Sequence, residues 1–498
     1  MKFKNFIYVF SLVLCILFSI SCVVAGDVND TIVASDANEL EMSSSDEDPV
    51  IAQTNDDSVS KGNNGTFTEL QAKIILTPDG GTINLDKDYY YENDSMFHIG
   101  MIIDKDLTIN GNGHSLDGMS KSRIFTINYG NLLKAHKVTL NNIVFKNGDA
   151  KIYGGAILNF ADLTVDKCTF TNNYAGTAGG AINSLGLLTL KNSKFDKNSA
   201  GGDAGAVFSL TFKKSWEFYR DYFGNSTVRE DANLLLNILM IPTLEPGKDY
   251  ISNCVFTRNV AKGTGGGAVY AFSHIDINSC TFNANKAREK GAAVFGCKNL
   301  YIKNSKFNRN SAGMYGGAVY FKCHEQTGKY VNGTWVSSVK FYSNLIENSI
   351  FANNFAGKRG GAIYGFKVAA SDNVHCAKAV KCTFMDNYAP NGNEIYGGIA
   401  KSCVYKNTKI TIKTVTVKKS ANGLVLTAGL KKGSAPLKYK VVTFKFNGKT
   451  YKAKTNSKGI AKCVIKSSIL NKLKVGKKVK YQASYSRFVA TKIAKVLK

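Results

Sequence analysis

Residues 168–182 read CTFTNNYAGTAGGAI, and variants of this segment recur along the middle of the chain. Each copy has a Phe, usually an Asn three residues later, an Ala five residues later, and then a Gly-Gly-Ala element followed by Ile or Val. Uninterrupted copies are 25 residues apart, which is the signature of a repeat architecture. The Phe positions are Phe145, Phe170, Phe195, Phe256, Phe282, Phe307, Phe351 and Phe384.

The residues before each Phe alternate between apolar and polar, as in LTVDKCTF at Leu163–Phe170, and a period of two predicts a strand. No copy has helical spacing, which excludes helical repeats, and the Leu/Asn frame of leucine-rich repeats is missing. Propeller blades need a longer unit with four strands. The sequence therefore predicts an all-β fold, in which each repeat forms one turn of a parallel β-helix.

In such a solenoid, equivalent residues stack about 4.8 Å apart in successive turns. We expect the Phe row to stack inside and to supply most of the buried apolar surface. An Asn row can satisfy buried corner amides turn after turn, and Asn also tolerates the left-handed backbone. Small Ala and Gly residues suit tight corners, because Gly allows positive φ. The two rows are represented by Phe170, Phe195, Phe282 and Phe307, and by Asn173, Asn198, Asn285 and Asn310.

The position two residues before each Phe is small and predicted to face inward. It holds Ile143, Cys168, Ser193, Cys254, Cys280, Ser305, Ser349 and Cys382. Cys254 and Cys280 fall on consecutive turns, so a bridge between them is an alternative to a plain row of small residues. The chain has no Cys-x-x-Cys and no His cluster, so we expect neither a metal nor another cofactor.

The N-terminal segments predict targeting and a spacer. Lys2 and Lys4 precede an apolar run, and small residues precede a cut after Ala25, so residues 1–25 read as a secretory signal. An uncleaved anchor is the alternative, because the run is long enough to span a bilayer. Residues 26–64 are acidic and are predicted to be a disordered spacer. Thr66 to Leu76 has helical spacing, at Phe67, Leu70, Ile74 and Ile75, and is expected to cap the first turn of the solenoid.

Charge is segregated along the 498 residues. The net charge is +27, of which residues 401–498 supply 26, from 25 Lys and one Arg without a single acid. Hydrophobic residues make up 44% of the chain, which excludes wholesale disorder. Residues 406–498 contain about seven short alternating segments, one pair joined by Asn447-Gly448, and predict a small β-sandwich. Its lysines alternate with apolar residues, so we expect them to face solvent.

The Phe-x-x-Asn and Gly-Gly-Ala-Ile pairing resembles the polymorphic outer membrane protein repeat. The opening TINGNGHSLDG at 108–118, followed by those repeats, resembles adhesin-like surface proteins of methanogenic archaea. The resemblance covers residues 65–405 and implies a right-handed parallel β-helix of the pectin-lyase type, secreted or displayed on the cell surface. The segment VTFKFNGKTYKAKTNSKGIAKCVI at 442–465 is similar to bacterial Ig-like repeats of surface adhesins.

Three insertions interrupt the repeat between the Gly-Gly-Ala element and the next Phe. Because all three open at one corner, we expect them to emerge on one face of the solenoid. The two longest contain both Trp residues of the chain and several tyrosines, which suggests an aromatic surface that stacks on sugar rings. The alternative is that these aromatics form small cores of the loops themselves. The residues concerned are Trp216, Tyr219, Tyr222, Tyr330, Trp335 and Tyr342.

These observations favour an adhesin-like binding protein over an enzyme. The repeat carboxylates occupy different positions and do not line up into the pair that a glycoside hydrolase needs. A polysaccharide lyase or hydrolase and a passive envelope protein remain the alternatives. The expected partners are glycans, or a host or neighbouring cell surface, for the loops. An anionic wall polymer is expected for the basic tail, unless its lysines form only a solvated face. Nucleic acid would satisfy the same charge, but secretion argues against it.

Overall fold

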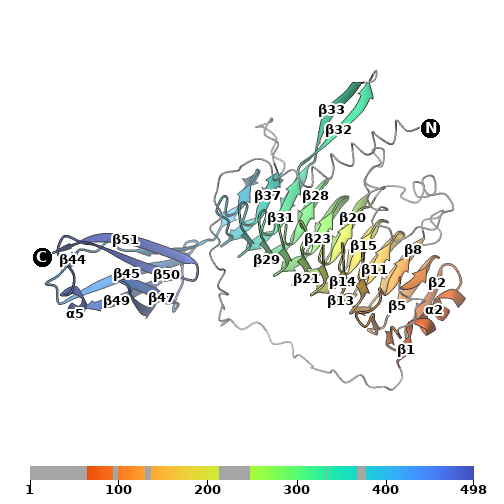
Figure 1. Ribbon diagram of the computed structural model, residues 1–498, viewed down its shortest axis with the longest axis horizontal. Coiled ribbons are helices and arrows are strands. Elements are labelled where there is room, and N and C mark those ends of the chain that lie inside the picture. The colour runs from red at the N-terminus through yellow and green to blue at the C-terminus, as the bar shows by residue number, and fades with distance from the viewer. Residues whose placement is uncertain (1–63, 93–98, 129–135, 212–246, 332–333, 367–376) are drawn as a thin grey trace. The chain divides into compact units, whose positions relative to one another are not determined.

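The computed structural model describes residues 64–92, 99–128, 136–211, 247–331, 334–366 and 377–498, with the backbone alone between residues 325 and 338. The predicted signal and most of the predicted spacer lie outside these residues. Within them the chain forms a parallel β-helix followed by a two-sheet β-sandwich, as the sequence predicts (Figure 1). No helix among the described residues has the length and hydropathy needed to cross a membrane.

Each full turn of the solenoid passes through four parallel sheets, which we name C, B, A and D in chain order. Sheet C consists of β4 (Met101–Ile103), β7 (Phe125–Ile127), β11 (Ile157–Asn159), β15 (Ile182–Ser184), β19 (Val207–Ser209), β23 (Val269–Ala271), β27 (Val294–Gly296), β31 (Val319–Lys322), β37 (Ile363–Phe366) and β40 (Ile395–Tyr396). Sheet B consists of β2 (Gly81–Asn84), β5 (Leu107–Asn110), β8 (Lys137–Asn141), β12 (Asp162–Asp166), β16 (Leu188–Lys191), β20 (Lys248–Ser252), β24 (His274–Asn278), β28 (Leu300–Lys303), β34 (Asn344–Glu347), β38 (Ala377–Val380) and β41 (Gly398–Lys401).

The other two sheets complete the turn. Sheet A consists of β1 (Gly65–Thr66), β3 (Tyr89–Tyr90), β6 (Ser115–Asp117), β9 (Val144–Lys146), β13 (Thr169–Thr171), β17 (Lys194–Asp196), β21 (Val255–Thr257), β25 (Thr281–Asn283), β29 (Lys306–Asn308), β35 (Ile350–Ala352), β39 (Thr383–Met385) and β42 (Val404–Tyr405). Sheet D consists of β10 (Asp149–Ala150), β14 (Tyr174–Ala175), β18 (Ser199–Ala200), β22 (Val260–Ala261), β26 (Lys286–Ala287), β30 (Ser311–Ala312) and β36 (Phe355–Ala356).

The Phe row forms the centre of the core, as predicted. Phe170 pairs in register with Phe195, and their rings stack with centroids 4.7 Å apart and an interplanar angle of 1°. Phe282 and Phe307 stack in the same way at 4.9 Å. All four side chains are at most 1% exposed, and the turns from Phe145 to Phe384 each add one buried ring to a continuous column.

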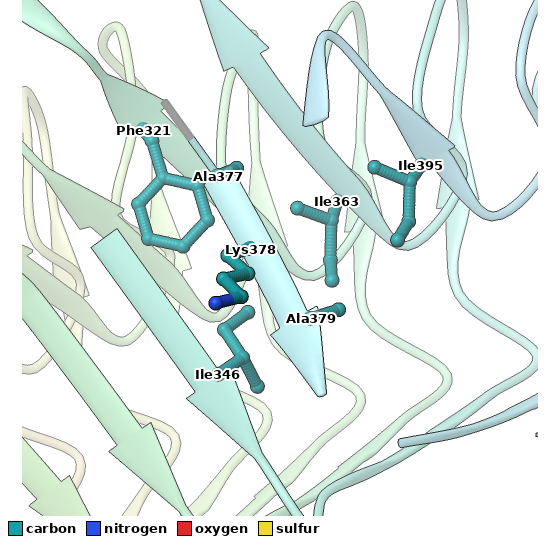
Figure 2. Close-up of a pocket in the computed structure, with 7 residues that line it drawn as sticks. All are labelled: Phe321, Ile346, Ile363, Ala377, Lys378, Ala379 and Ile395. Carbon is teal, nitrogen blue, oxygen red and sulfur yellow. The ribbon is translucent and has the colours of Figure 1, made fainter. Parts of the chain in front are cut away.

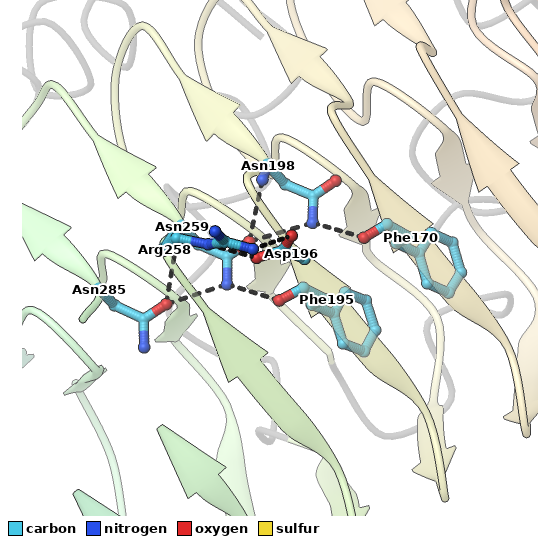
Figure 3. Close-up of polar contacts among 7 residues, drawn as sticks. All are labelled: Phe170, Phe195, Asp196, Asn198, Arg258, Asn259 and Asn285. Atoms are coloured by element: carbon cyan, nitrogen blue, oxygen red, sulfur yellow. Dashed lines mark hydrogen bonds and ion pairs between the residues drawn. The ribbon is translucent and has the colours of Figure 1, made fainter. Parts of the chain in front are cut away.

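The Asn row is confirmed as a hydrogen-bonded ladder (Figure 3). Asn173 Nδ2 donates to Asn198 Oδ1 at 2.9 Å, and Asn285 Nδ2 donates to Asn310 Oδ1 at 3.0 Å. The same Oδ1 of Asn198 also accepts the backbone N–H of Asn173, and its Nδ2 donates to the carbonyl of Phe170. These side chains are fully buried, and each satisfies backbone groups of neighbouring turns.

Two corners differ from the sequence expectation. Leu163–Phe170 is not one strand, because Lys167 has φ +53° and turns the chain between β12 and β13. The second corner places the left-handed backbone one residue before the ladder, at Asn172 (φ +55°) and Lys197 (φ +56°). The ladder Asn is therefore selected for its hydrogen bonds, and the preceding residue carries the backbone strain.

The two glycines of each Gly-Gly-Ala element have different roles. The first has a left-handed backbone, as at Gly179 with φ +69°. The second allows close approach: a Cβ on Gly180 would lie 2.2 Å from the carbonyl oxygen of Gly205 in the next turn. Cys254 and Cys280, which could have formed a bridge, are both free. Cys323, at the base of an insertion, is disulfide-bonded.

Helix α2 (Phe67–Leu76) caps the first turn, as expected. Thr66 is its N-cap residue and accepts the N–H of Glu69 through its side chain. Phe67, Leu70 and Ile74 are buried, whereas Ile75, which the spacing placed on the same face, is 66% exposed.

The C-terminal sandwich has two sheets. One contains β43 (Thr408–Ile412), β45 (Gly423–Lys432), β46 (Ala435–Pro436) and β49 (Ile460–Lys466). The other contains β44 (Val417–Lys418), β51 (Phe488–Leu497), β50 (Lys478–Tyr485), β47 (Val441–Phe446) and β48 (Lys449–Lys454). The predicted hairpin turn has positive φ at Asn447 and Gly448, and one short helix, α5 (Ser467–Leu470), was not predicted. The core includes Leu426, Phe444, Ile465 and Tyr481.

Candidate functional site

All three insertions leave the solenoid at the same corner, as predicted. They follow β19, β31 and β37 of sheet C, and the chain returns to sheet B at β20, β34 and β38. The second insertion is an antiparallel hairpin of β32 (His324–Val331) and β33 (Thr334–Phe341) (Figure 1). One corner of the solenoid therefore carries all of its large additions.

The structure describes few of the predicted aromatic residues. Trp216, Tyr219 and Tyr222 lie outside the described residues. Tyr330 and Trp335 are backbone partners across the hairpin, and their side chains lie outside the described part. Tyr342 is only 5% exposed, and its hydroxyl accepts a hydrogen bond of 2.8 Å from Lys298 Nζ. This tyrosine therefore supports the base of the hairpin and offers little surface to a ligand.

Asx side chains secure the return from the two longer insertions. Asp249 faces the core, where Oδ1 accepts the N–H of Leu188 at 2.9 Å and Oδ2 accepts from the hydroxyls of Ser209 and Ser273. Asn344 occupies the equivalent position after the hairpin, and its Oδ1 accepts the N–H of Leu300 at 3.0 Å. In both turns a side chain satisfies the backbone donor of the turn before the insertion.

Sheet C carries a second aromatic column that the sequence analysis missed. Its members are the second residues of six strands of sheet C and point away from the core, yet the first five are at most 8% exposed. Neighbouring rings stack with centroids 4.4 to 5.5 Å apart. The signal was the residue directly after each Gly-Gly-Ala-Ile/Val element. The column consists of Phe208, Tyr270, Phe295, Tyr320, Tyr364 and Tyr396.

Corner residues lie against this column. Lys290 Nζ is 5.8 Å from the ring centre of Tyr320, and Tyr315 packs against Tyr364 with centroids 4.8 Å apart. Burial raises the pKa of the Tyr320 hydroxyl well above its ordinary value. The column is thus a packed outer layer of sheet C, which residues of the corner between sheets D and C partly cover.

The outer face of sheet B has an open group of a different kind, which we call the tyrosine slot: Lys248, Tyr250, Asp276 and Tyr301. Asp276 lies between the two tyrosines in the strand register, and Tyr250 is 47% exposed. Lys248 Nζ lies 2.8 Å from Asp276 Oδ2, 5.3 Å from the ring centre of Tyr250 and 6.0 Å from that of Tyr301. The ion pair raises the pKa of the Lys248 ammonium.

One cluster of described residues has ligand atoms close enough to hold a cation. Atoms of Asp79, Asp106 and His136 lie within 4.8 Å of one another. However, Asp79 accepts the N–H of Asp106 and Asp106 accepts the N–H of Lys137, both through Oδ1, so these carboxylates already join successive turns.

A small space lies inside the last turns, where Ala377 and Ala379 replace the larger inward residues of earlier sheet B strands (Figure 2). Phe321, Ile346, Ile363 and Ile395 line it. The space has no room for a water molecule, so it is not a ligand pocket.

Several carboxylates of the repeats are engaged in contacts between turns. Asp196 forms an ion pair with Arg258 at 2.6 Å, and Asp166 accepts from Asn192 Nδ2 at 2.7 Å (Figure 3 shows the first). These contacts join neighbouring turns of the solenoid.

The basic tail presents its lysines outward, as expected. Lys445 alternates with buried Phe444 and Phe446, and Lys480 with buried Val479 and Tyr481, while exposed Lys452 lies between half-buried Tyr451 and Ala453. Residues 401–498 contain no Asp or Glu, so no acidic side chain of the tail offsets the positive potential of its lysines.

Comparison with known proteins identifies the repeat. Residues 167–185 and 348–365 match the family model of the Chlamydia polymorphic membrane protein repeat. Each match covers a corner, strands of sheets A, D and C, and the Gly-Gly-Ala element. No curated protein and no solved structure matches the chain. The solenoid is therefore built, at least in these two turns, from repeats similar to those of the Chlamydia polymorphic membrane proteins.

Proposed function

We propose that this protein is a secreted or cell-surface adhesin-like protein that binds glycans or partner surfaces through its solenoid. The observation that carries the proposal is the repeat match, which links two turns to a family of membrane-displayed proteins. The shared insertion corner supports it, because additions on one side of a rigid scaffold form a continuous surface for a partner.

The basic sandwich is proposed to associate with an anionic wall polymer or membrane surface. Residues 406–498 hold 25 positive charges and no Asp or Glu, and described lysines point outward from the sheet. Such attraction acts over about a Debye length, roughly 8 Å at physiological salt, and therefore falls as salt rises.

This part of the proposal predicts a charge-dependent attachment of the full chain. The triple variant Lys445→Glu, Lys452→Glu and Lys480→Glu should bind an anionic polymer surface at least about tenfold more weakly than the wild type, with a shallower dependence on salt. Surface plasmon resonance between 50 and 500 mM salt, roughly 14 to 4 Å of screening length, measures both.

A matched control reverses three exposed lysines on the solenoid, Lys194, Lys286 and Lys306, with the same change in net charge. If both triple variants lose affinity equally, the tail has no special role and only net charge matters. Binding that is indifferent to salt would contradict electrostatic attachment altogether.

A further inference from the structure

The tyrosine slot has the geometry of a binding site on the outer face of sheet B. Tyr250, Asp276 and Tyr301 are register partners on three consecutive turns, so their side chains project from the same row. The two tyrosines are two strand spacings apart, about 10 Å. Two aromatic side chains thus flank one carboxylate along the solenoid axis, over a length close to that of a disaccharide.

The hydrogen bonding of the slot is incomplete. Asp276 Oδ2 is paired with Lys248 Nζ, whereas Asp276 Oδ1 is shielded from water and has no hydrogen-bond partner. A shielded carboxylate oxygen without a donor costs free energy, which a ligand hydroxyl can recover. The side chain of Lys248 is 45% exposed and can move aside, because it is held by one ion pair and the two ring faces.

The chemistry of these four residues selects one class of ligand. Aromatic rings bind the apolar C–H faces of sugars, while a carboxylate and an ammonium group bind hydroxyls as acceptor and donor. Lys248 and Asp276 neutralise each other, so the slot has no net charge with which to attract a polyanion. A cationic ligand would compete with Lys248 for the same carboxylate.

We propose that the tyrosine slot binds a neutral saccharide chain, with Tyr250 and Tyr301 as stacking platforms and Asp276 as the hydroxyl acceptor. The inference rests on the proposed glycan-binding function for its ligand class. It places the ligand contact on the strands of the solenoid rather than on the insertions. An experiment can therefore contradict the slot assignment without contradicting the adhesin-like function.

Tyr174 provides an internal comparison. It is 36% exposed on sheet D, and Lys262 Nζ lies 6.0 Å from its ring centre, as in the slot. Two turns further along its row stands Val260 rather than a second tyrosine. Tyr174 therefore shares the exposed ring and the lysine but lacks the paired platform, which makes it the matched control.

The test uses the full chain on a printed array of neutral oligosaccharides of two to six hexoses, followed by calorimetric titration with the best ligand. Tyr250→Ala and Tyr301→Ala should each weaken binding about tenfold or more, and Asp276→Asn should weaken it about threefold. Tyr174→Ala should bind as the wild type does. All four variants should keep the wild-type melting temperature within a few degrees, because the side chains are on the outer face.

Three results would overturn the inference. The first is a wild-type protein that retains no neutral oligosaccharide at millimolar concentration. The second is wild-type affinity in both tyrosine variants, and the third is an equal loss in Tyr174→Ala. If the slot variants keep wild-type oligosaccharide binding and also attach to cells as the wild type does, the slot assignment fails while the adhesin-like function stands. Loss of attachment to cells together with loss of oligosaccharide binding supports both.

Discussion

Asp249 is a buried carboxylate that lies between apolar residues in an inward row of sheet B. Its neighbours in that row, Leu188 and Ile275, are buried hydrophobic residues. Desolvation raises the pKa of Asp249 above its ordinary value of 3.8, against the opposing effect of the hydroxyls of Ser209 and Ser273. The charged form is thus disfavoured in the folded protein.

We expect Asp249→Asn to remove the loss of stability that follows when this buried carboxyl ionises. Because the pKa of the folded carboxyl is raised, its contribution to stability is complete below about pH 3.8 and is lost as the pH rises through the folded value. The unfolding free energy of the variant should therefore rise relative to the wild type as the pH increases above about 3.8, by about 1.4 kcal/mol for each pH unit up to the pKa of the folded carboxyl. Melting curves across this range measure it, and parallel curves for the two proteins would refute the raised pKa.

At the residue scale, the sequence predicts those residues whose packing or hydrogen-bonding role recurs from turn to turn. The Phe column and the Asn ladder could be predicted because burial and buried amides recur every 25 residues. The roles of Asp249 and Asn344 could not be predicted, because each residue satisfies a backbone donor at the return from one insertion and does not recur in every turn. The left-handed corner was assigned to the wrong neighbour, because Lys197 and Asn172 share no side-chain chemistry.

At the element scale, the ladder joins turns more tightly than strand pairing alone. Asn259 Oδ1 accepts from both the backbone and Nδ2 of Asn198, and its own Nδ2 donates to the carbonyl of Phe195 and to Asn285 Oδ1 (Figure 3). Loss of this one side chain would leave several buried polar groups without partners, each at a cost of about 1 to 3 kcal/mol.

We expect Asn259→Ala to destabilise the solenoid by about 3 kcal/mol or more, measured by denaturant titration. Asn283→Ala is the control: its Oδ1 faces outward and accepts one bond of 3.1 Å from Asn308 Nδ2. That variant should lose no more than about 1 kcal/mol. Equal losses in the two variants would mean that the ladder contributes nothing beyond a surface amide.

The types of elements were readable from the sequence, but their ends were not. Alternation predicted strands, yet Leu163–Phe170 contains a corner, because inward and outward positions continue to alternate across a left-handed residue. The outward aromatic column was missed for a related reason. Outward positions were expected to be polar, whereas corner residues such as Tyr315 cover that row.

At the scale of the whole molecule, a solenoid must protect its ends, since a first turn exposes apolar rows with no neighbour. Helix α2 fulfils this role at the N-terminal end of the described solenoid. Leu70 is fully buried there, while Ile75 on the same helix is 66% exposed.

Leu70→Gln should therefore lower stability by about 3 kcal/mol or more and promote association, because it combines lost burial with a buried amide. Ile75→Gln should change stability by less than about 0.5 kcal/mol. Size-exclusion chromatography and thermal melting of both variants provide the comparison. A monomeric Leu70→Gln protein with wild-type melting would show that the cap is dispensable.

The solenoid and the sandwich of the described residues were predictable because a 25-residue period and an abrupt change in charge are long-range patterns. The tyrosine slot was not, because Tyr250 and Tyr301 are 51 residues apart in sequence and become neighbours of Asp276 only through the strand register. The identity of a ligand depends on such local arrangements of side chains. A comparison of the repeats position by position does not reveal them.

The shared corner between sheets C and B also bears on how such a chain can diversify. Asp249 and Asn344 close the hydrogen bonding of the turn on either side of a long addition, so the helical stack does not depend on what lies between departure and return. We expect peptides grafted at this corner, with Asp or Asn at the return, to leave the solenoid folded. The turns of the solenoid can thus stay the same while the inserted segments vary.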